Sequence, residues 1–207
     1  RALAPFDRDF ENALVFVPRP YGPWLNHPFQ TLRNGGSLES GDVLYAQNRD
    51  PAGDFAVIDA YPNRRLYWFT FRGEWHAGPS PVTPALERLR VRDGPSHAIT
   101  TRVGVVGRPS TVRIETGDVA VVERAADANG TLTVDWRVNG THATLGDRSI
   151  PIDGAEEVTL SVTFVQAGGA TLTYRQEVSV EARGDSVRLV WPAEVRVCRL
   201  CLLYTSD

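Results

Sequence analysis

The stretch TLTVDWRV, residues 131–138, decides what kind of fold the chain can adopt. Its apolar and polar residues alternate one by one: Leu132, Val134, Trp136 and Val138 against Thr131, Thr133, Asp135 and Arg137. A two-residue period places every apolar side chain on the same face of a strand. The stretch therefore predicts a β-strand with one face in a core and the other in solvent.

The same period recurs through the second part of the chain. Two further alternating sets are Val158, Leu160, Val162 and Phe164, and Leu172, Tyr174, Val178 and Val180. Shorter apolar segments lie around Leu89, Val103, 112–114, 119–122 and 187–191. Turn dipeptides separate them: Gly117-Asp118, Asn129-Gly130, Asn139-Gly140, Gly168-Gly169 and Gly184-Asp185. Short strands with one apolar face each predict two sheets packed face to face, an antiparallel immunoglobulin-like β-sandwich at residues 84–197.

The first part of the chain has a different pattern of apolar residues. Residues 13–17, ALVFV, form a continuous apolar run, which is typical of a strand buried on both faces. Further strands are expected at 42–46 and 65–71, and helices at 26–32 and 54–60. The order β-α-β-α-β with short connections predicts a small parallel sheet.

A proline-rich break at residues 73–84 separates the two hydrophobic patterns. We therefore predict an α+β chain in two parts, a three-stranded α/β unit at 1–78 and the sandwich at 84–197. The last ten residues, 198–207, depart from the alternation and contain both cysteines, Cys198 and Cys201. We interpret them as a non-native tail.

Composition excludes some classes of partner. The net charge is −3, and all 22 basic residues are Arg, spread along the whole chain. Without a basic patch, no nucleic-acid partner is predicted. No apolar run approaches the roughly 20 residues that cross a bilayer. The chain begins at Arg1 without an initiator Met, so we expect it to be a fragment or a processed product.

The densest cluster of candidate ligand-binding residues follows the first predicted strand, where open α/β sheets place their ligands. Its members are Tyr21, Trp24, Asn26, His27 and Gln30. The aromatic rings could stack on a sugar while the amides and the imidazole bond its hydroxyls. The alternative, which we favour, is a proline-stiffened loop whose aromatic side chains pack and whose Asn26 caps a helix.

Catalytic and metal-binding patterns are absent from the sequence. The four histidines, at 27, 76, 97 and 142, have no partner at metal-ligand spacing. Asp50, Asp54 and Asp59 could suggest acid–base chemistry, but Asp54 is expected to cap its helix and the others to lie in turns. We predict no catalytic residue, no metal and no cofactor.

Two stretches match the N-glycosylation sequon, Asn129-Gly130-Thr131 and Asn139-Gly140-Thr141. Each is also expected to be an Asn-Gly hairpin turn. The two interpretations are compatible, because a glycan requires an exposed loop.

Residues 13–71 carry a family resemblance. The segments that carry it are Val43-Leu44-Tyr45-Ala46, Asn48-Arg49-Asp50, and Tyr61-Pro62-Asn63-Arg64 with Tyr67. They resemble the region after the membrane spans in haloarchaeal-type polytopic membrane glycosyltransferases of the dolichyl-phosphate-mannose or aminoarabinose-transferase-like superfamily. The resemblance implies an enzyme that uses a lipid-phosphate-linked sugar, with catalytic carboxylates in membrane-domain loops outside this sequence.

Three hypotheses follow. On the preferred one, the chain is a non-catalytic accessory region on the extracytoplasmic face of the cell membrane, tethered by transmembrane segments of its parent glycosyltransferase. Its partners would be the membrane-embedded domain and a carbohydrate or lipid-linked sugar. The second is a carbohydrate-binding module of a cell-surface protein. The third is a purely structural cell-surface sandwich, because this architecture alone implies no activity.

Overall fold

The structure is a computed structural model that describes residues 11–17, 41–72 and 83–199. It divides into two compact units, Arg1–Arg90 and Val91–Asp207. Strand β4, Thr83–Gly94, passes from the first unit into the second without interruption. The helix expected at 26–32 and most of the proline-rich break lie outside the described residues.

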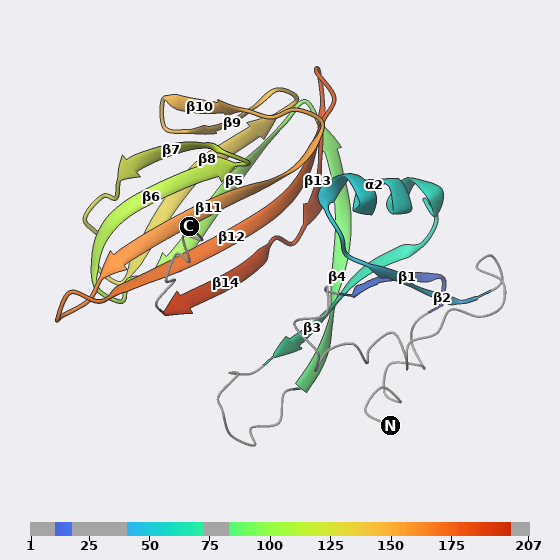
Figure 1. Cartoon of the computed structure of the whole chain (residues 1–207), viewed down its shortest axis with the longest axis horizontal. Helices are drawn as coiled ribbons and strands as arrows, with labels where there is room; N and C mark the ends of the chain where they lie inside the picture. The colour runs from blue at the N-terminus through green and yellow to red at the C-terminus, as the bar shows by residue number, and fades with distance from the viewer. Residues whose placement is uncertain (1–10, 18–40, 73–82, 200–207) are drawn as a thin grey trace, which may run out of the picture. The chain divides into compact units, whose positions relative to one another are not determined.

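The first unit is built on a small sheet with the strand order β2-β1-β3-β4 (Figure 1). Its described elements are β1 (Ala13–Val17), β2 (Val43–Gln47), α2 (Pro51–Ala60), β3 (Arg65–Arg72) and the first part of β4. β1 pairs in parallel with both β2 and β3, as predicted. β4 then joins β3 in antiparallel orientation, which makes the sheet mixed, a feature that the sequence reasoning did not foresee.

Strand β1 is central in this sheet, which explains its continuous apolar run. All five of its residues are buried, with alternate side chains on opposite faces. Val15 and Val17 share one cluster with Phe69. Helix α2 also contributes buried apolar residues, Phe55 and Ile58, one turn apart.

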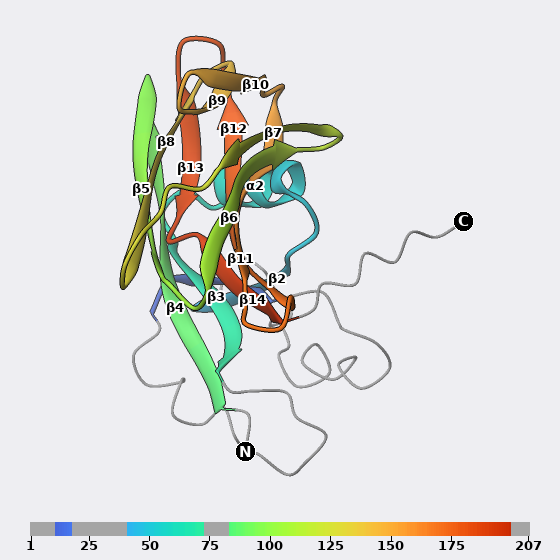
Figure 2. The same ribbon diagram turned by 90° about the vertical axis from the view of Figure 1, so that its left-hand side faces the viewer.

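The second unit consists of two sheets. One has the order β13-β12-β11-β6-β7, with β14 also paired to β12, and the other has the order β10-β9-β8-β5. The strands are β5 (Ser96–Gly104), β6 (Arg108–Thr116), β7 (Val119–Arg124), β8 (Thr131–Asn139), β9 (His142–Leu145), β10 (Arg148–Pro151), β11 (Ala155–Val165), β12 (Thr171–Ala182), β13 (Val187–Trp191) and β14 (Glu194–Arg199). Every strand pair given for these two sheets is antiparallel. Figure 2 views the two layers edge-on, with β5 and β8 in one and β6, β11 and β12 in the other.

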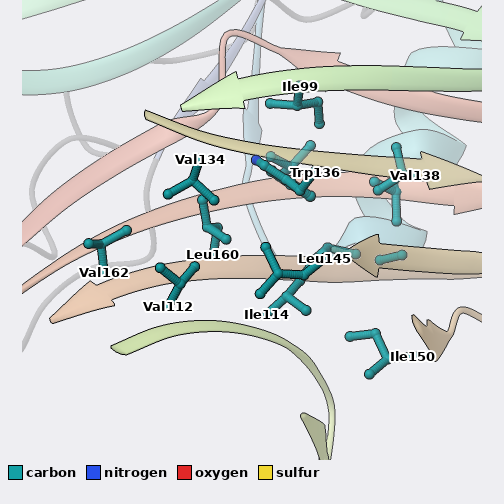
Figure 3. Close-up of a cluster of buried hydrophobic side chains, with 14 of the residues drawn as sticks. Ile99, Val112, Ile114, Val134, Trp136, Val138, Leu145, Ile150, Leu160 and Val162 are labelled. Carbon is teal, nitrogen blue, oxygen red and sulfur yellow. The ribbon is translucent and has the colours of Figure 1, made fainter. Parts of the chain in front are cut away.

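The two sheets enclose one hydrophobic core, so the second unit is a β-sandwich (Figure 3). Strand β8 shows the predicted alternation without a fault, with four buried residues between exposed ones. Facing residues in the core come from both layers: Ile99, Val134, Trp136 and Val138 from β5 and β8, and Val112, Ile114, Leu160 and Val162 from β6 and β11. Burial of these side chains is the main force that holds the layers together.

The dipeptide Asn129-Gly130 is not a hairpin turn, contrary to prediction. β7 belongs to one sheet and β8 to the other, so the segment between them crosses from layer to layer. The equivalent dipeptide Asn139-Gly140 does join two paired strands, β8 and β9. The turns at Gly117-Asp118, Gly168-Gly169 and Gly184-Asp185 also join paired neighbours, as predicted.

The end of the chain continues the sandwich further than predicted. β14 pairs with β12 as far as Arg199, opposite Leu172. Cys198 and Arg199, the first two residues of the segment interpreted as a tail, therefore belong to a strand. The remainder of that segment, including Cys201, lies outside the described residues.

Candidate functional site

The predicted ligand-binding cluster follows directly after β1. Its five residues, Tyr21, Trp24, Asn26, His27 and Gln30, lie outside the described residues. The last described residue before the cluster is Val17, whose carbonyl oxygen accepts a 2.9 Å hydrogen bond from the backbone N–H of Asn48. After the end of β2, the chain continues into helix α2.

Helix α2 begins one turn earlier than expected, and its cap is Asp50, not Asp54. The Asp50 carboxylate accepts a 2.8 Å hydrogen bond from the backbone N–H of Gly53. Pro51 follows at the first helical position, where its missing N–H costs nothing. The expectation that Asp54 caps the helix and that Asp50 lies in a turn is therefore wrong.

Asp54 lies inside the first turn of the helix and is buried. Its carboxylate accepts from the backbone N–H of Arg49 over 3.3 Å. A carboxylate near a helix N-terminus is stabilised by the orphan N–H groups and by the helix dipole. Asp59, close to the other end of α2, is also helical, so the prediction that it lies in a turn is wrong. These contacts give Asp50 and Asp54 a structural task at the start of the helix.

At the N-terminal ends of the parallel strands, the Arg64 side chain forms hydrogen bonds to the backbone at the start of β1 and directly before β2. Its guanidinium donates to the carbonyl oxygens of Ala13, at 3.3 Å, and Asp42, at 3.1 Å. The same guanidinium lies over the ring of Tyr61, 5.7 Å from its centroid. Asn63 contributes as well, because its carbonyl oxygen accepts a 2.7 Å hydrogen bond from the Asn12 side chain.

The residues that carry the family resemblance thus have identifiable structural tasks. Val43 to Ala46 lie in β2, Asn48 bonds to β1, and Asp50 caps α2. The backbone N–H of Tyr61 donates the last hydrogen bonds of α2, to the carbonyl oxygens of Val57 and Ile58. Arg64 bonds to the backbone at the start of β1 and directly before β2. The motif is a signature of how this unit folds.

In the sandwich, a pocket of about 390 Å³ opens at one end. It is formed by the β5–β6 turn and the β7–β8 crossing segment, and its lining is Val105, Gly107, Arg108, Pro109, Asp127, Ala128 and Asn129. The two segments are joined where the backbone N–H of Val105 donates to the carbonyl oxygen of Gly130 over 2.9 Å. A guanidinium, a carboxylate and an amide beside apolar walls can bond the hydroxyls and cover the faces of a small polar molecule.

A second pocket, of about 340 Å³, lies on the outer face of the β6, β11 and β12 layer. It is lined by Glu115, Thr116, Gly117, Glu156, Glu157, Thr159 and Arg175. Here Glu115 is paired with Arg113 at 2.6 Å and with Arg175 at 3.4 Å. Part-exposed pairs of this kind contribute little to stability, and the described lining contains no group of metal ligands.

Two of the four histidines lie in the described part. His97 points toward β13, where Nε2 is 3.2 Å from the carbonyl oxygen of Val187. His142 follows the Asn139 turn, with Nδ1 2.8 Å from the hydroxyl of Thr141. Across the described residues, no cluster of His, Cys, Asp and Glu that would hold a metal ion is present. His27 and His76 lie outside that part.

Sequence reasoning missed a polar link inside the sandwich core. Thr101 on β5 donates to Oε1 of Gln176 on β12, in the opposite layer, and accepts from the indole N–H of Trp136. The alternation of β12 does indicate that Gln176 faces the core, because position 176 has the same parity as the inward positions 174 and 178. The core-facing strand therefore carries an amide where an apolar residue is expected.

Comparison with known families settles what this arrangement belongs to. A family described as a domain of unknown function, DUF7846, matches residues 13–178. The chain belongs to the DUF7846 family. The range matched to DUF7846 begins with β1 and ends within β12, so it includes the described elements of the first unit and the second unit as far as β12. A search of curated proteins and a search of solved structures found no match.

The DUF7846 match covers the motif segments of the first unit and both pockets of the second. In the described residues, no helix has the length and apolar character needed to span a bilayer.

Proposed function

We propose that this chain is an extracytoplasmic, non-catalytic accessory region of a membrane glycosyltransferase that transfers sugar from a lipid-phosphate donor. One observation carries the proposal. The segments that resemble the glycosyltransferase tails are those that build the β1-β2-α2-β3 unit, through the Asp50 cap and the Arg64 bonds at the start of β1 and directly before β2. Because these shared residues serve the folding of the unit, they support an accessory role.

Two described carboxylates of the first unit favour the same interpretation. Asp50 and Asp54 both accept from backbone N–H groups. A general acid or base must instead reach a substrate proton. The accessory region would position the acceptor or pack against the membrane-embedded domain, while the reacting carboxylates belong to that domain.

For the sandwich we propose an immunoglobulin-like connectivity. β5 pairs with β8, and β6 pairs with β11, which pairs with β12. Constant-type immunoglobulin sandwiches pair strand B with E, and C with F and then G. The β9–β10 hairpin after β8 is an addition to that plan.

The test uses the full-length parent protein in membranes, with a polyprenyl-phosphate-linked sugar as donor. Asp50→Asn retains an oxygen acceptor for the Gly53 N–H and so preserves the cap, but it removes the acid–base group. We expect the rate of sugar transfer to remain unchanged. A catalytic carboxylate would instead cost about a hundredfold or more.

A large loss of transfer in Asp50→Asn membranes, with normal protein levels, would refute the accessory role. So would a parent gene that encodes no multiple membrane spans beside this region. The matched control is Asp50→Ala, which loses the cap. It should lower stability without a specific effect on the chemical step.

A second candidate function is carbohydrate binding, favoured by the 390 Å³ end pocket with Arg108 and Asp127 in its lining. Titration of the isolated chain with a panel of oligosaccharides tests it, with Asp127→Asn as the binding-deficient variant. If no sugar binds, this candidate fails and a structural spacer remains the alternative to the accessory role.

A further inference from the structure

The two sequons have the same three letters, Asn-Gly-Thr, but different structural settings. One lies in the β7–β8 crossing segment and the other in the β8–β9 hairpin. Enzymatic N-glycosylation needs both the Asn amide and the hydroxyl two residues later to enter the enzyme's site. The setting of each sequon in the folded chain therefore decides whether it can react.

The Asn139 sequon is closed by its own hydrogen bonds. The side-chain oxygen Oδ1 of Asn139 accepts from the backbone N–H groups of Thr141, at 2.9 Å, and His142, at 2.7 Å. It also accepts from the hydroxyl of Thr141 over 3.2 Å. The amide oxygen of Asn139 and the hydroxyl of Thr141 are thus hydrogen-bonded to each other in a tight turn.

Gly140, between them, is packed against a second turn. An added Cβ at Gly140 would lie 2.1 Å from the carbonyl oxygen of Gly184, so the backbones approach as closely as glycine allows. The backbone N–H of Gly184 donates to the carbonyl oxygen of Gly140 over 3.1 Å. Val138 and Ala143 on either side are fully buried. Thr141 is exposed and Asn139 is half-buried, but the turn is held in this conformation by these contacts. Reshaping the sequon to enter an enzyme's site therefore requires local unfolding of a core hairpin.

The Asn129 sequon is open. Asn129, Gly130 and Thr131 are all exposed. The segment that contains Asn129 and Gly130 lies outside the strands. It is anchored by the buried residues Ala125 and Leu132, by the partly buried Ala128 and by the bond from Val105 to the Gly130 carbonyl oxygen. An added Cβ at Gly130 would meet nothing within 4 Å. Among the described residues, no hydrogen bond engages the Asn129 side chain, so its amide is accessible.

We propose that the folded chain is an N-glycosylation acceptor at Asn129 and not at Asn139. The nitrogen of the Asn129 amide forms a bond to the anomeric carbon of a lipid-pyrophosphate-linked oligosaccharide. The bond from that carbon to the phosphate oxygen breaks, and its electron pair leaves with the lipid pyrophosphate. The amide nitrogen loses one proton, which balances the transfer.

The position of Asn129 gives the glycan a structural consequence. Asn129 lines the end pocket together with Val105 and Pro109. A sugar on Asn129 would cover the apolar walls formed by Val105 and Pro109 and restrict access to the pocket. Glycosylation of Asn129 in the cell rests on the extracytoplasmic location proposed above. The preference for Asn129 over Asn139 does not depend on that location.

The selectivity is tested in vitro on the whole folded chain. The reagents are a purified single-subunit oligosaccharyltransferase that accepts Asn-x-Ser/Thr and a lipid-pyrophosphate-linked oligosaccharide, and peptide mapping by mass spectrometry locates the glycan. We expect modification at Asn129, with Asn139 reacting about a hundredfold more slowly or less, because it must first open. Synthetic peptides of residues 125–134 and 135–144, which have no fold to protect them, should react at similar rates.

Two matched variants separate the sites. Thr131→Ala should abolish modification of the folded chain, and Thr141→Ala should leave it unchanged. Comparable modification of Asn139 in the folded chain would overturn the proposal, as would an unmodified Asn129 in the chain or in its peptide. A parent protein without membrane spans would refute the proposed function but leave this result intact, so the two failures are distinguishable.

Discussion

Trp136 donates its indole N–H to the hydroxyl oxygen of Thr101 over 3.0 Å, across two paired strands of one sheet. The Thr101 hydroxyl donates in turn to Oε1 of Gln176 in the facing sheet. Trp136 and Gln176 are both buried, at 3% and 8% exposure. The hydroxyl therefore satisfies two groups that would be costly to bury alone, and it joins the layers at one defined register.

The first prediction concerns this link. Thr101→Val keeps the shape but leaves the indole N–H and the Gln176 amide unsatisfied, so we expect the free energy of unfolding to fall by about 2 to 4 kcal/mol. Chemical denaturation measures it. Thr100→Val, on the exposed side of the same strand, is the control and should change stability by less than about 1 kcal/mol. Equal losses in the two variants would contradict the buried link.

The second prediction concerns the contact between the Gly140 and Gly184 turns. Gly140→Ala places a Cβ 2.1 Å from a carbonyl oxygen, so the turns must separate. We expect a loss of about 2 kcal/mol or more in unfolding experiments. Gly104→Ala is the control, because its Cβ would meet nothing within 4 Å. If both alanine variants unfold at the same denaturant concentration, the close approach is not real.

The third prediction concerns the cap of α2. Asp50→Ala removes the acceptor for the Gly53 N–H and should destabilise the first unit by about 1 kcal/mol. Asp50→Asn should be close to neutral, because asparagine caps as well as aspartate. Thermal unfolding followed by circular dichroism measures both. Loss of stability on Asp50→Asn alone would point to a need for the charge instead.

The fourth prediction concerns Arg64. Arg64→Ala leaves the carbonyl oxygens of Ala13 and Asp42 without this donor, so we expect a loss of about 1 to 3 kcal/mol. Arg65→Ala, at the exposed neighbouring position, should cost less than about 0.5 kcal/mol. Hydrogen exchange of the β1 amides reports on the affected edge. Unchanged β1 protection in Arg64→Ala would show that the edge is held by other contacts.

Local patterns predicted the parts of the fold that depend on local rules. The apolar run at 13–17 became a strand buried on both faces, and the alternation at 131–138 became half-buried β8. The helix near residue 54 was found, but its start was misplaced, although Pro51 after Asp50 is itself a recognisable start signal. The candidate ligand-binding residues between 21 and 30 lie outside the described part and stay predictions.

Non-local contacts account for what the sequence reasoning missed. Asn129-Gly130 and Asn139-Gly140 are identical dipeptides, yet only the second joins paired strands. The difference arises because β8, which follows Asn129-Gly130, belongs to a different sheet from β7, which precedes it. Likewise, Thr101 and Gln176 are 75 positions apart, and nothing in their neighbourhoods signals that they meet.

By itself the sequence determined most strands of the sandwich and which of their faces are apolar, because a strand's side chains alternate with a period that local composition reveals. It did not reveal β9, β10 or β14. It also placed the two sequons. Tertiary structure alone decided which strands pair, which polar groups meet inside the core, and which sequon is left open. Those outcomes depend on backbone approaches such as Gly140 to Gly184, between residues that are distant in the chain.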